Sequence, residues 1–229
     1  MKLKFGALVV DGSGKIGGHV VSKNRGGKYL RTKSTPTNPQ TQAQTAQRAT
    51  LGGLASSWPL LTDAQRLSFN SAVNDFIGTD IFGDQRTPSG NNLYVGLNMN
   101  TTNGGFPLLT SAPAKENVNL PVNLSADFDL SSETLRIAFS TELETDVKLL
   151  VYATPSLSPG KSYAKNQFRL IGSFTAVGTD FEDTGEVYLA YVAKYGTPAI
   201  GANIQIGLRR VVASGQVSPL QKVTASVVA

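Results

Sequence analysis

Hydrophobic and polar residues follow two different patterns in the two halves of the chain. From residue 117 onward, short apolar runs alternate with turn residues at the spacing typical of a β-sandwich. About seven strands in about 110 residues is the size of an immunoglobulin or fibronectin type III domain. The segment VYLAYVAKY alternates well, and residues 144–146 and 213–216 are credible hairpin turns. The runs that predict strands are 122–130, 134–141, 147–154, 168–176, 186–196, 203–214 and 217–227.

Before this β region, apolar residues recur at helical spacing and predict a small helical module. Residues 43–58 form a first helix, weakened by a Gly-Gly pair and ended by Pro59. Thr62 and Gln65 fit a capping box that starts a second helix. Ser89 is expected to cap a third short helix. The second helix is expected to carry its apolar side chains on one face: Phe69, Ala72, Val73 and Phe76.

A glycine-rich stretch near the N-terminus, DGSGKIGG, contains G-x-G-x-x-G at Gly12, Gly14 and Gly17. A dinucleotide fingerprint needs the last glycine to open a helix that holds the pyrophosphate. The glycines and β-branched residues that follow here favour strand, turn and strand instead. A phosphate loop would need glycine and Ser/Thr where Val9 and Ile16 stand. We therefore expect no nucleotide and no other cofactor.

Two strand-like segments, HVVSKN and KYLRTKS, flank a Gly-Gly pair, which is a common two-residue hairpin turn. Residues 1–48 hold nine Lys/Arg and one Asp, a net charge of +8, and residues 49–229 have a net charge of −3. This split suggests that the hairpin meets something negative, either nucleic acid or an acidic surface of a neighbouring subunit. The predicted partner-binding residues are Lys23, Arg25, Lys28, Tyr29, Arg31 and Lys33.

Two kinds of partner fit this basic hairpin. Nucleic acid would use the cations on phosphates, with Tyr29 as a stacking group. However, the hairpin has a single aromatic residue and no helix-turn-helix, RNA-recognition or OB pattern. A protein neighbour is the favoured partner, with DNA as the alternative. A third reading is a surface adhesin whose β loops bind glycans.

Residues suited to catalysis or metal binding are scarce. The single histidine, His19, lies in the glycine-rich region, with no nucleophile elbow in the chain, and is expected to be a surface strand residue. There is no cysteine, which excludes disulfides and thiolate metal sites. Carboxylates gather at 142–146 and 180–183, where solvated turn residues are expected and a weak Ca²⁺ site at 180–183 is the alternative. We expect no enzyme activity, no catalytic residue and no metal.

The 229 residues suit one large or two ordinary domains. No apolar run approaches a membrane span of about 20 residues, and the N-terminal run is too short for a secretion signal. We therefore expect a soluble cytoplasmic product without a membrane partner. The predicted class is α+β, with a basic β-hairpin arm at 1–35, a linker and small helical module at 36–112, and an immunoglobulin/fibronectin-like β-sandwich at 117–229.

Five segments in the N-terminal region follow one another in a characteristic order. They are a glycine-rich opening, a basic strand, a Pro/Gln/Thr-rich stretch, a Trp-containing stretch and a Ser-Gly-x-Asn-Leu motif, at residues 14–18, 24–31, 36–48, 58–66 and 89–94. In these segments the chain resembles a family of tailed-phage and prophage structural proteins. The resemblance covers roughly residues 12–98, and the family commonly ends in an immunoglobulin-like β domain. It carries over no catalytic residues.

This resemblance implies a component of the virion, made in the host cytoplasm. We expect a capsid-associated auxiliary or decoration protein, with a tail or collar protein as the alternative. Its expected partners are other virion proteins, either the major capsid protein or neighbouring copies in a homo-oligomeric assembly.

Overall fold

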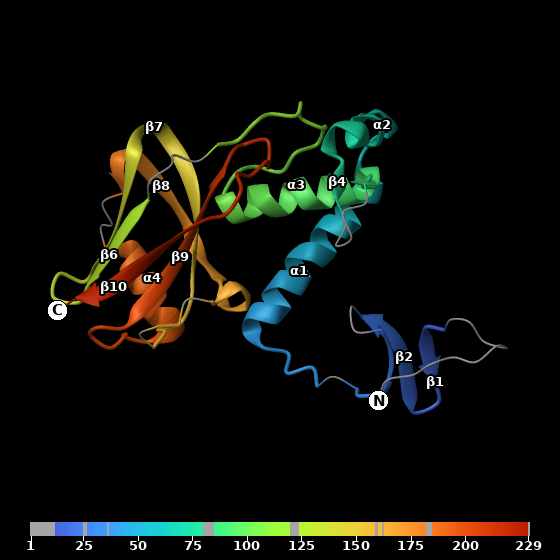
Figure 1. Cartoon of the computed structure of the whole chain (residues 1–229). Coiled ribbons are helices and arrows are strands. Elements are labelled where there is room, and N and C mark those ends of the chain that lie inside the picture. Colours follow the sequence, from blue (N-terminus) through green and yellow to red (C-terminus); the bar gives the residue numbers. More distant parts are fainter. Residues whose placement is uncertain are drawn as a thin grey trace. The chain divides into compact units, whose positions relative to one another are not determined.

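The computed structural model describes residues 12–228 except 25–26, 36, 80–84, 120–123, 159, 162 and 182–184, and without the side chains of 24, 27, 139–147 and 176–181. The chain divides into two compact units, residues 1–46 and 47–229. Figure 1 labels most of the helices and strands of the two units, which are described separately below.

The first unit is built around an antiparallel sheet in the order β1-β2-β3, the arm sheet, with strands Gly14–Ile16, His19–Asn24 and Gly27–Thr32. Gly17 has a positive φ of 55°, which suits glycine in the turn that leads into β2. The prediction of strand, turn and strand is thus confirmed, and no helix follows the glycine motif. The β2–β3 hairpin is also confirmed, but Asn24 pairs with Gly27. Gly27 is therefore the first residue of β3 and not a turn residue as predicted.

The helices of the second unit follow their predicted signals. The first, α1 (Gln42–Ser57), begins in the first unit and ends before the 3-10 turn η1 (Trp58–Leu60), which contains Pro59. The Thr62–Gln65 capping box is present at the start of α2 (Asp63–Ala72), and Ser89 caps α3 (Gly90–Gly104). All three predicted helices are confirmed. The remaining short elements are η2 (Val73–Phe76), β4 (Gly78–Thr79) and β5 (Gln85–Arg86).

An aromatic cluster forms the core of this helical part. The ring centroids of Phe69 and Tyr94 lie 5.3 Å apart, and that of Trp58 lies 5.5 Å from Tyr94. Phe69 is fully buried, as predicted for the apolar face of α2. Such edge-on and tilted pairs each stabilise the fold by about 0.5–1.5 kcal/mol beyond the burial of their area. The cluster fixes α2 against α3.

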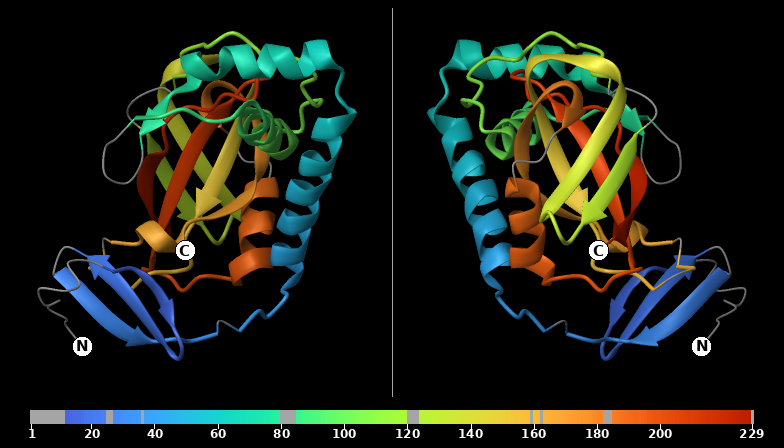
Figure 2. Two further views of the ribbon diagram at one scale, coloured as in Figure 1. Left: turned by 90° about the vertical axis from the view of Figure 1, so that its right-hand side faces the viewer. Right: turned by 90° about the vertical axis from the view of Figure 1, so that its left-hand side faces the viewer.

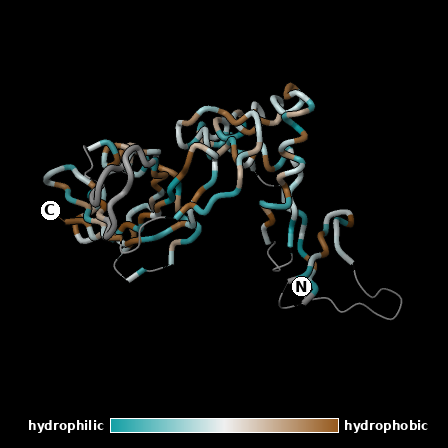
Figure 3. The backbone as a smooth tube through the Cα atoms, turned by 90° about the horizontal axis from the view of Figure 1, so that it is seen from above, coloured by the Kyte–Doolittle hydropathy of each residue, from teal (hydrophilic) through white to brown (hydrophobic). Residues whose placement is uncertain are grey.

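The β region contains one sheet in the order β6-β10-β9-β7-β8, with an additional β6–β7 pairing. Exposed and buried positions alternate along β6, and Figure 3 shows the hydropathy of each residue along the backbone. The hairpin turn predicted at 213–216 is confirmed between β9 and β10. The first and last strands of the region, β6 and β10, pair in parallel. The strands are β6 (Ser125–Asp129), β7 (Thr134–Ala153), β8 (Arg169–Phe181), β9 (Asn203–Val211) and β10 (Gln221–Val228), with η3 (Lys165–Gln167) before β8.

Two of the predicted strands, 134–141 and 147–154, are one continuous strand in the structure. The turn predicted at 144–146 is wrong, because β7 runs through it. The polar residues there coincide with register shifts in the β7–β8 pairing, between Ala138 and Leu143 and between Leu143 and Val147. An irregularity inside a long strand and a hairpin turn both use polar residues, which is why the pattern was misleading.

The strand predicted at 186–196 is a helix, α4 (Glu186–Tyr195), which lies against the strands in Figure 2. Val187, Tyr188 and Tyr191 are buried in the sheet core, and they are spaced as one helical face. Gly185 and Gly196, both at positive φ, flank the helix. Burial raises the pKa of the Tyr191 phenol well above its ordinary value.

The fold is therefore α+β, with helices followed by a mostly β region, as predicted at that level. Within the second unit, hydrogen bonds connect the β9–β10 turn to α3 and to the segment 114–116. The side chain of Asn100 on α3 donates to the carbonyl of Gly215 in the β9–β10 turn, at 2.8 Å. The side-chain amide of Gln216 accepts from Glu116 N at 3.0 Å and donates to Ala114 O at 2.7 Å. Residues 47–229 form one compact unit, and the boundary at 112–117 stays a prediction.

Candidate interaction sites

The arm sheet carries the partner-binding residues predicted from sequence. Lys23 lies on β2, Lys28, Tyr29 and Arg31 lie on β3, and Lys33 follows the end of β3. Lys23, Arg31 and Lys33 are exposed, and Lys28 and Tyr29 are half-buried. Arg25 lies outside the described residues.

The register of β2 and β3 decides which of these side chains share a face. Lys23 is directly opposite Lys28, and Val21 is opposite Leu30 two positions away. In an antiparallel pair, opposite residues and those two positions along point to the same side of the sheet. The other face carries Tyr29 and Arg31. The predicted cations are thus divided between the two faces, and one face carries the lysine pair next to the buried Val21 and the half-buried Leu30.

A lysine pair in opposite positions of a sheet places two like charges close together. Opposite residues in a sheet have Cβ atoms about 5 Å apart, and like charges placed there are destabilising. The sequence has no acidic residue between Asp11 and Asp63. An acidic surface laid over this face would convert the repulsion into attraction. The arrangement therefore suits docking on a negatively charged partner.

The other predicted chemistry is distributed as follows. His19 is an exposed residue of β2, as predicted. The side chains of the carboxylate groups at 142–146 and 180–183 lie outside the description, so the alternative Ca²⁺ site there stays a prediction. Within the described part of the chain, no three His, Cys, Asp or Glu side chains come together in a group that could hold a metal ion. None of the helices in that part is long and apolar enough to cross a membrane.

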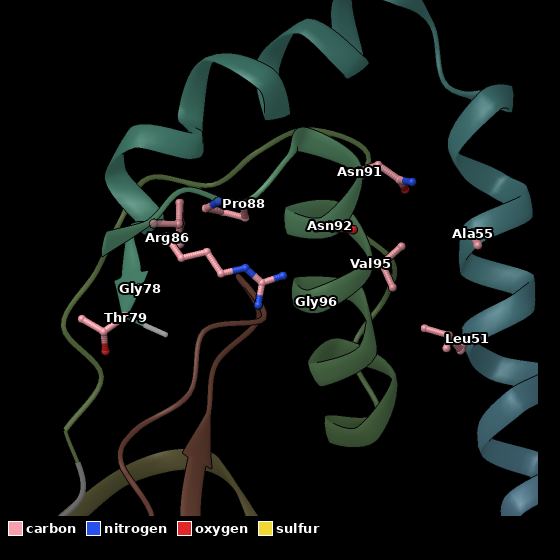
Figure 4. Close-up of a pocket in the computed structure, with 11 residues that line it drawn as sticks. Leu51, Ala55, Gly78, Thr79, Arg86, Pro88, Asn91, Asn92, Val95 and Gly96 are labelled. Carbon is pink, nitrogen blue, oxygen red and sulfur yellow. The ribbon is translucent and has the colours of Figure 1, made fainter. Parts of the chain in front are cut away.

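The second unit contains a groove that the sequence analysis did not find (Figure 4). Its volume is about 690 Å³, and it lies along α3 between α1 and the β4–β5 hairpin. Leu51 and Ala55 of α1 face Val95 of α3 on one side, and Arg86 extends toward α3 from the other side. The floor between them is the exposed surface of Asn92 and Gly96. The groove thus combines an apolar wall with a cation and two amides.

Two residues of the groove, Asn91 and Gly96, have features that no contact among the described residues explains. The Oδ1 atom of Asn91 is buried without a hydrogen-bond partner among the described residues. Leaving such an acceptor unpaired costs about 1–3 kcal/mol. A Cβ on Gly96 would have no atom within 4 Å, so no described contact requires glycine there. Glycine inside the helix is the one signal in the sequence that could have indicated this site.

Comparisons with known proteins give the following. No family model matches the chain, and no curated protein matches it. Among solved structures, it is similar to an Fn3-like protein from Clostridium thermocellum, with 16% identity over 49% of this chain and 95% of that one, at a TM-score of 0.30. It is also similar to a β-1,2-glucanase from Parabacteroides distasonis, with 15% identity over 52% of this chain and 14% of that one, at a TM-score of 0.33. Likenesses this distant carry no functional argument.

Proposed function

We propose that this chain is a structural component of a tailed-phage virion, which assembles in many copies by docking its basic arm sheet on an acidic surface of a neighbouring subunit. The observation that carries the docking step is the Lys23–Lys28 pair, held in register on one face beside Val21 and Leu30. The virion itself is supported by the resemblance of residues 12–98 to phage structural proteins.

The position that we propose in the particle is the head, as a capsid-associated auxiliary or decoration protein. A tail or collar position is the alternative. Its partners would be the major capsid protein or neighbouring copies of this chain. In this role the chain is not an enzyme and acts through contacts alone.

For the β region we propose a divergent immunoglobulin-like sandwich. The pairing of β7 supports it. The first part of β7, residues 134–138, pairs with β6 and with the end of β8, whereas residues 148–153 pair with β9 and the start of β8. The register shifts lie between these two parts. One strand could therefore contribute to both layers of a sandwich, with α4 in the place of a strand.

The test of the docking step is to neutralise the lysine pair with Lys23→Gln and Lys28→Gln. Exposed cations contribute little to folding, so the melting temperature of the purified variant should stay the same or rise slightly. Incorporation into particles, measured by complementing a phage that lacks the gene, should fall about tenfold or more, because charge pairs at an interface control association.

A matched control is Lys161→Gln with Lys165→Gln, which removes two exposed lysines from the second unit. This control should be incorporated normally. Equal incorporation of both double variants would contradict the proposal. If the wild-type protein also bound duplex DNA tightly, with a steep dependence on salt, the arm would be a nucleic-acid-binding device instead.

A further inference from the structure

The helix α1 is poorly buried for its length. Of residues Gln42–Ser57, Leu54 is the buried one, and Arg48 is the single charged residue. Helices of this length are marginal in water without tertiary packing, and an exposed helix normally carries many charges. Depletion of charge is instead typical of the core of a protein interface. The face of α1 that carries Leu51, 49% exposed, and Ala55 forms the apolar wall of the groove.

On the floor of the groove, Gly96 permits a close approach. Glycine in a helix interior costs about 1 kcal/mol relative to alanine. Here that cost has no described compensation inside the chain, since a Cβ would be in open space. It would be offset if a partner backbone lay directly on α3. The unpaired Oδ1 of Asn91 would then accept a hydrogen bond from an N–H of that backbone.

The chain itself contains a segment with matching chemistry. Between the arm sheet and α1 it runs Thr-Pro-Thr-Asn-Pro-Gln-Thr over residues 35–41, the linker, in which Pro36 and Pro39 have P-x-x-P spacing. Its described residues are exposed and outside any helix or strand. Such segments favour the polyproline II conformation, which docks in apolar, aromatic-lined grooves at a low cost in conformational entropy. Phe76 supplies an aromatic ring to this groove.

Charge favours a second copy of this chain as the source of that segment. Residues 1–46 have eight basic residues and one acidic residue, a net charge of +7, and residues 47–229 have a net charge of −2. Residues 58–100, which supply most of the groove, have four acidic residues and two arginines. Lys33 precedes the linker, and Asp75 adjoins Phe76 at the groove. These opposite net charges favour contact between the first unit of one copy and the second unit of another.

We propose that the groove between α1 and α3 binds the linker of a second copy. This deepens the proposed function, because it names the contact by which neighbouring copies are joined. The prolines lie against Leu51, Ala55 and Phe76. A linker N–H bonds Asn91, and the guanidinium of Arg86 and the amide of Asn92 donate to linker carbonyl groups.

The absence of cysteine from the sequence allows a direct test in the full-length purified protein. One population carries Thr37→Cys and a second, with a different tag, carries Ala55→Cys; they are mixed and oxidised. We expect disulfide-linked heterodimers about tenfold or more above the level of a control pair, because binding raises the effective concentration of the two thiols. The control partner is Ser56→Cys, which is exposed on the same helix but does not line the groove.

A second variant tests the groove by filling its floor. Gly96→Leu, added to the second population, which carries Ala55→Cys, fills the floor and should abolish the cross-link from Thr37→Cys. The matched control is Gly52→Leu, at another helix glycine with open space around its Cβ but outside the groove. Both variants should melt at or above the wild-type temperature, since leucine favours helix over glycine.

Equal cross-linking to positions 55 and 56, or an undiminished cross-link in Gly96→Leu, would overturn the inference. A disulfide that forms within one chain carrying both cysteines, with none between copies, would show that the linker binds its own groove and would also overturn it. These measurements need no particle. The two proposals can fail separately. If the cross-link does not form but the Lys23→Gln/Lys28→Gln variant is still poorly incorporated into particles, the groove inference is wrong and the proposed function is still supported.

Discussion

Replacing Gly215 with alanine should lower the free energy of unfolding by about 3 kcal/mol or more. Gly215 has φ of 72°, and a Cβ there would lie 2.4 Å from the carbonyl oxygen of Leu97 on α3. Alanine in this left-handed region costs about 1 kcal/mol, and the clash with a helix backbone adds to it. For a chain of this size the melting temperature should fall by about 10 °C, measured by circular dichroism or calorimetry.

The matched control is Gly201→Ala. Gly201 has a similar φ of 78°, but no atom lies within 4 Å of the added Cβ. It should therefore show the conformational cost alone, about 1 kcal/mol. Equal destabilisation of the two variants would mean that the β9–β10 turn does not approach α3 as closely as the structure has it.

The second large effect is expected for Asn98→Ala. Asn98 is fully buried on α3, and its amide pairs with Leu109 in both directions, donating to the carbonyl at 3.2 Å and accepting from the N–H at 2.6 Å. The alanine variant leaves both backbone groups without that partner and opens a small cavity. We expect a loss of about 3 kcal/mol in urea unfolding.

Asn92→Ala is the control for this variant, because Asn92 is an exposed asparagine of the same helix. It should be neutral or slightly stabilising, since alanine is the better helix former. A cost below about 1 kcal/mol for Asn98→Ala would show that water replaces the lost bonds and that the segment after α3 does not depend on this clamp.

Local signals predicted the parts of the fold that local chemistry determines. The capping residues Thr62 and Ser89 set the starts of α2 and α3, and the side chain of each accepts from the backbone N–H three positions on. A hydrogen bond between residues that are close in sequence requires particular residue types at a fixed spacing, so it can be recognised as a short sequence motif. These elements could therefore be placed without knowledge of the rest of the chain.

Elements determined by distant contacts were not predicted. The segment that became α4 has hydrophobic residues at both periods, and burial of Tyr188 and Tyr191 against the sheet selects the helix. The residues at 144–146 stay extended because β7 is paired along its length with strands far away in sequence. Tertiary context overrides local preference at both places.

In the candidate sites, too, features set by local sequence were predicted and features set by distant contacts were not. The cations and the hairpin could be predicted from the sequence, but the lysine pair depends on the register in which Asn24 is opposite Gly27. With the predicted turn at Gly26 and Gly27, Lys23 would be opposite Leu30 instead of Lys28. The groove could not be predicted, because α1, α3 and the β4–β5 hairpin form it together.

The parallel pairing of β6 with β10 has a mechanical consequence. Val227 is paired with Phe128, and Leu130 N donates to Val228 O at 3.2 Å. A force that pulls the segments before β6 and after β10 apart would slide the two parallel strands past each other. Their hydrogen bonds would then be loaded in shear instead of being opened one after another as in unzipping. This geometry resists tension between the start of β6 and the end of β10.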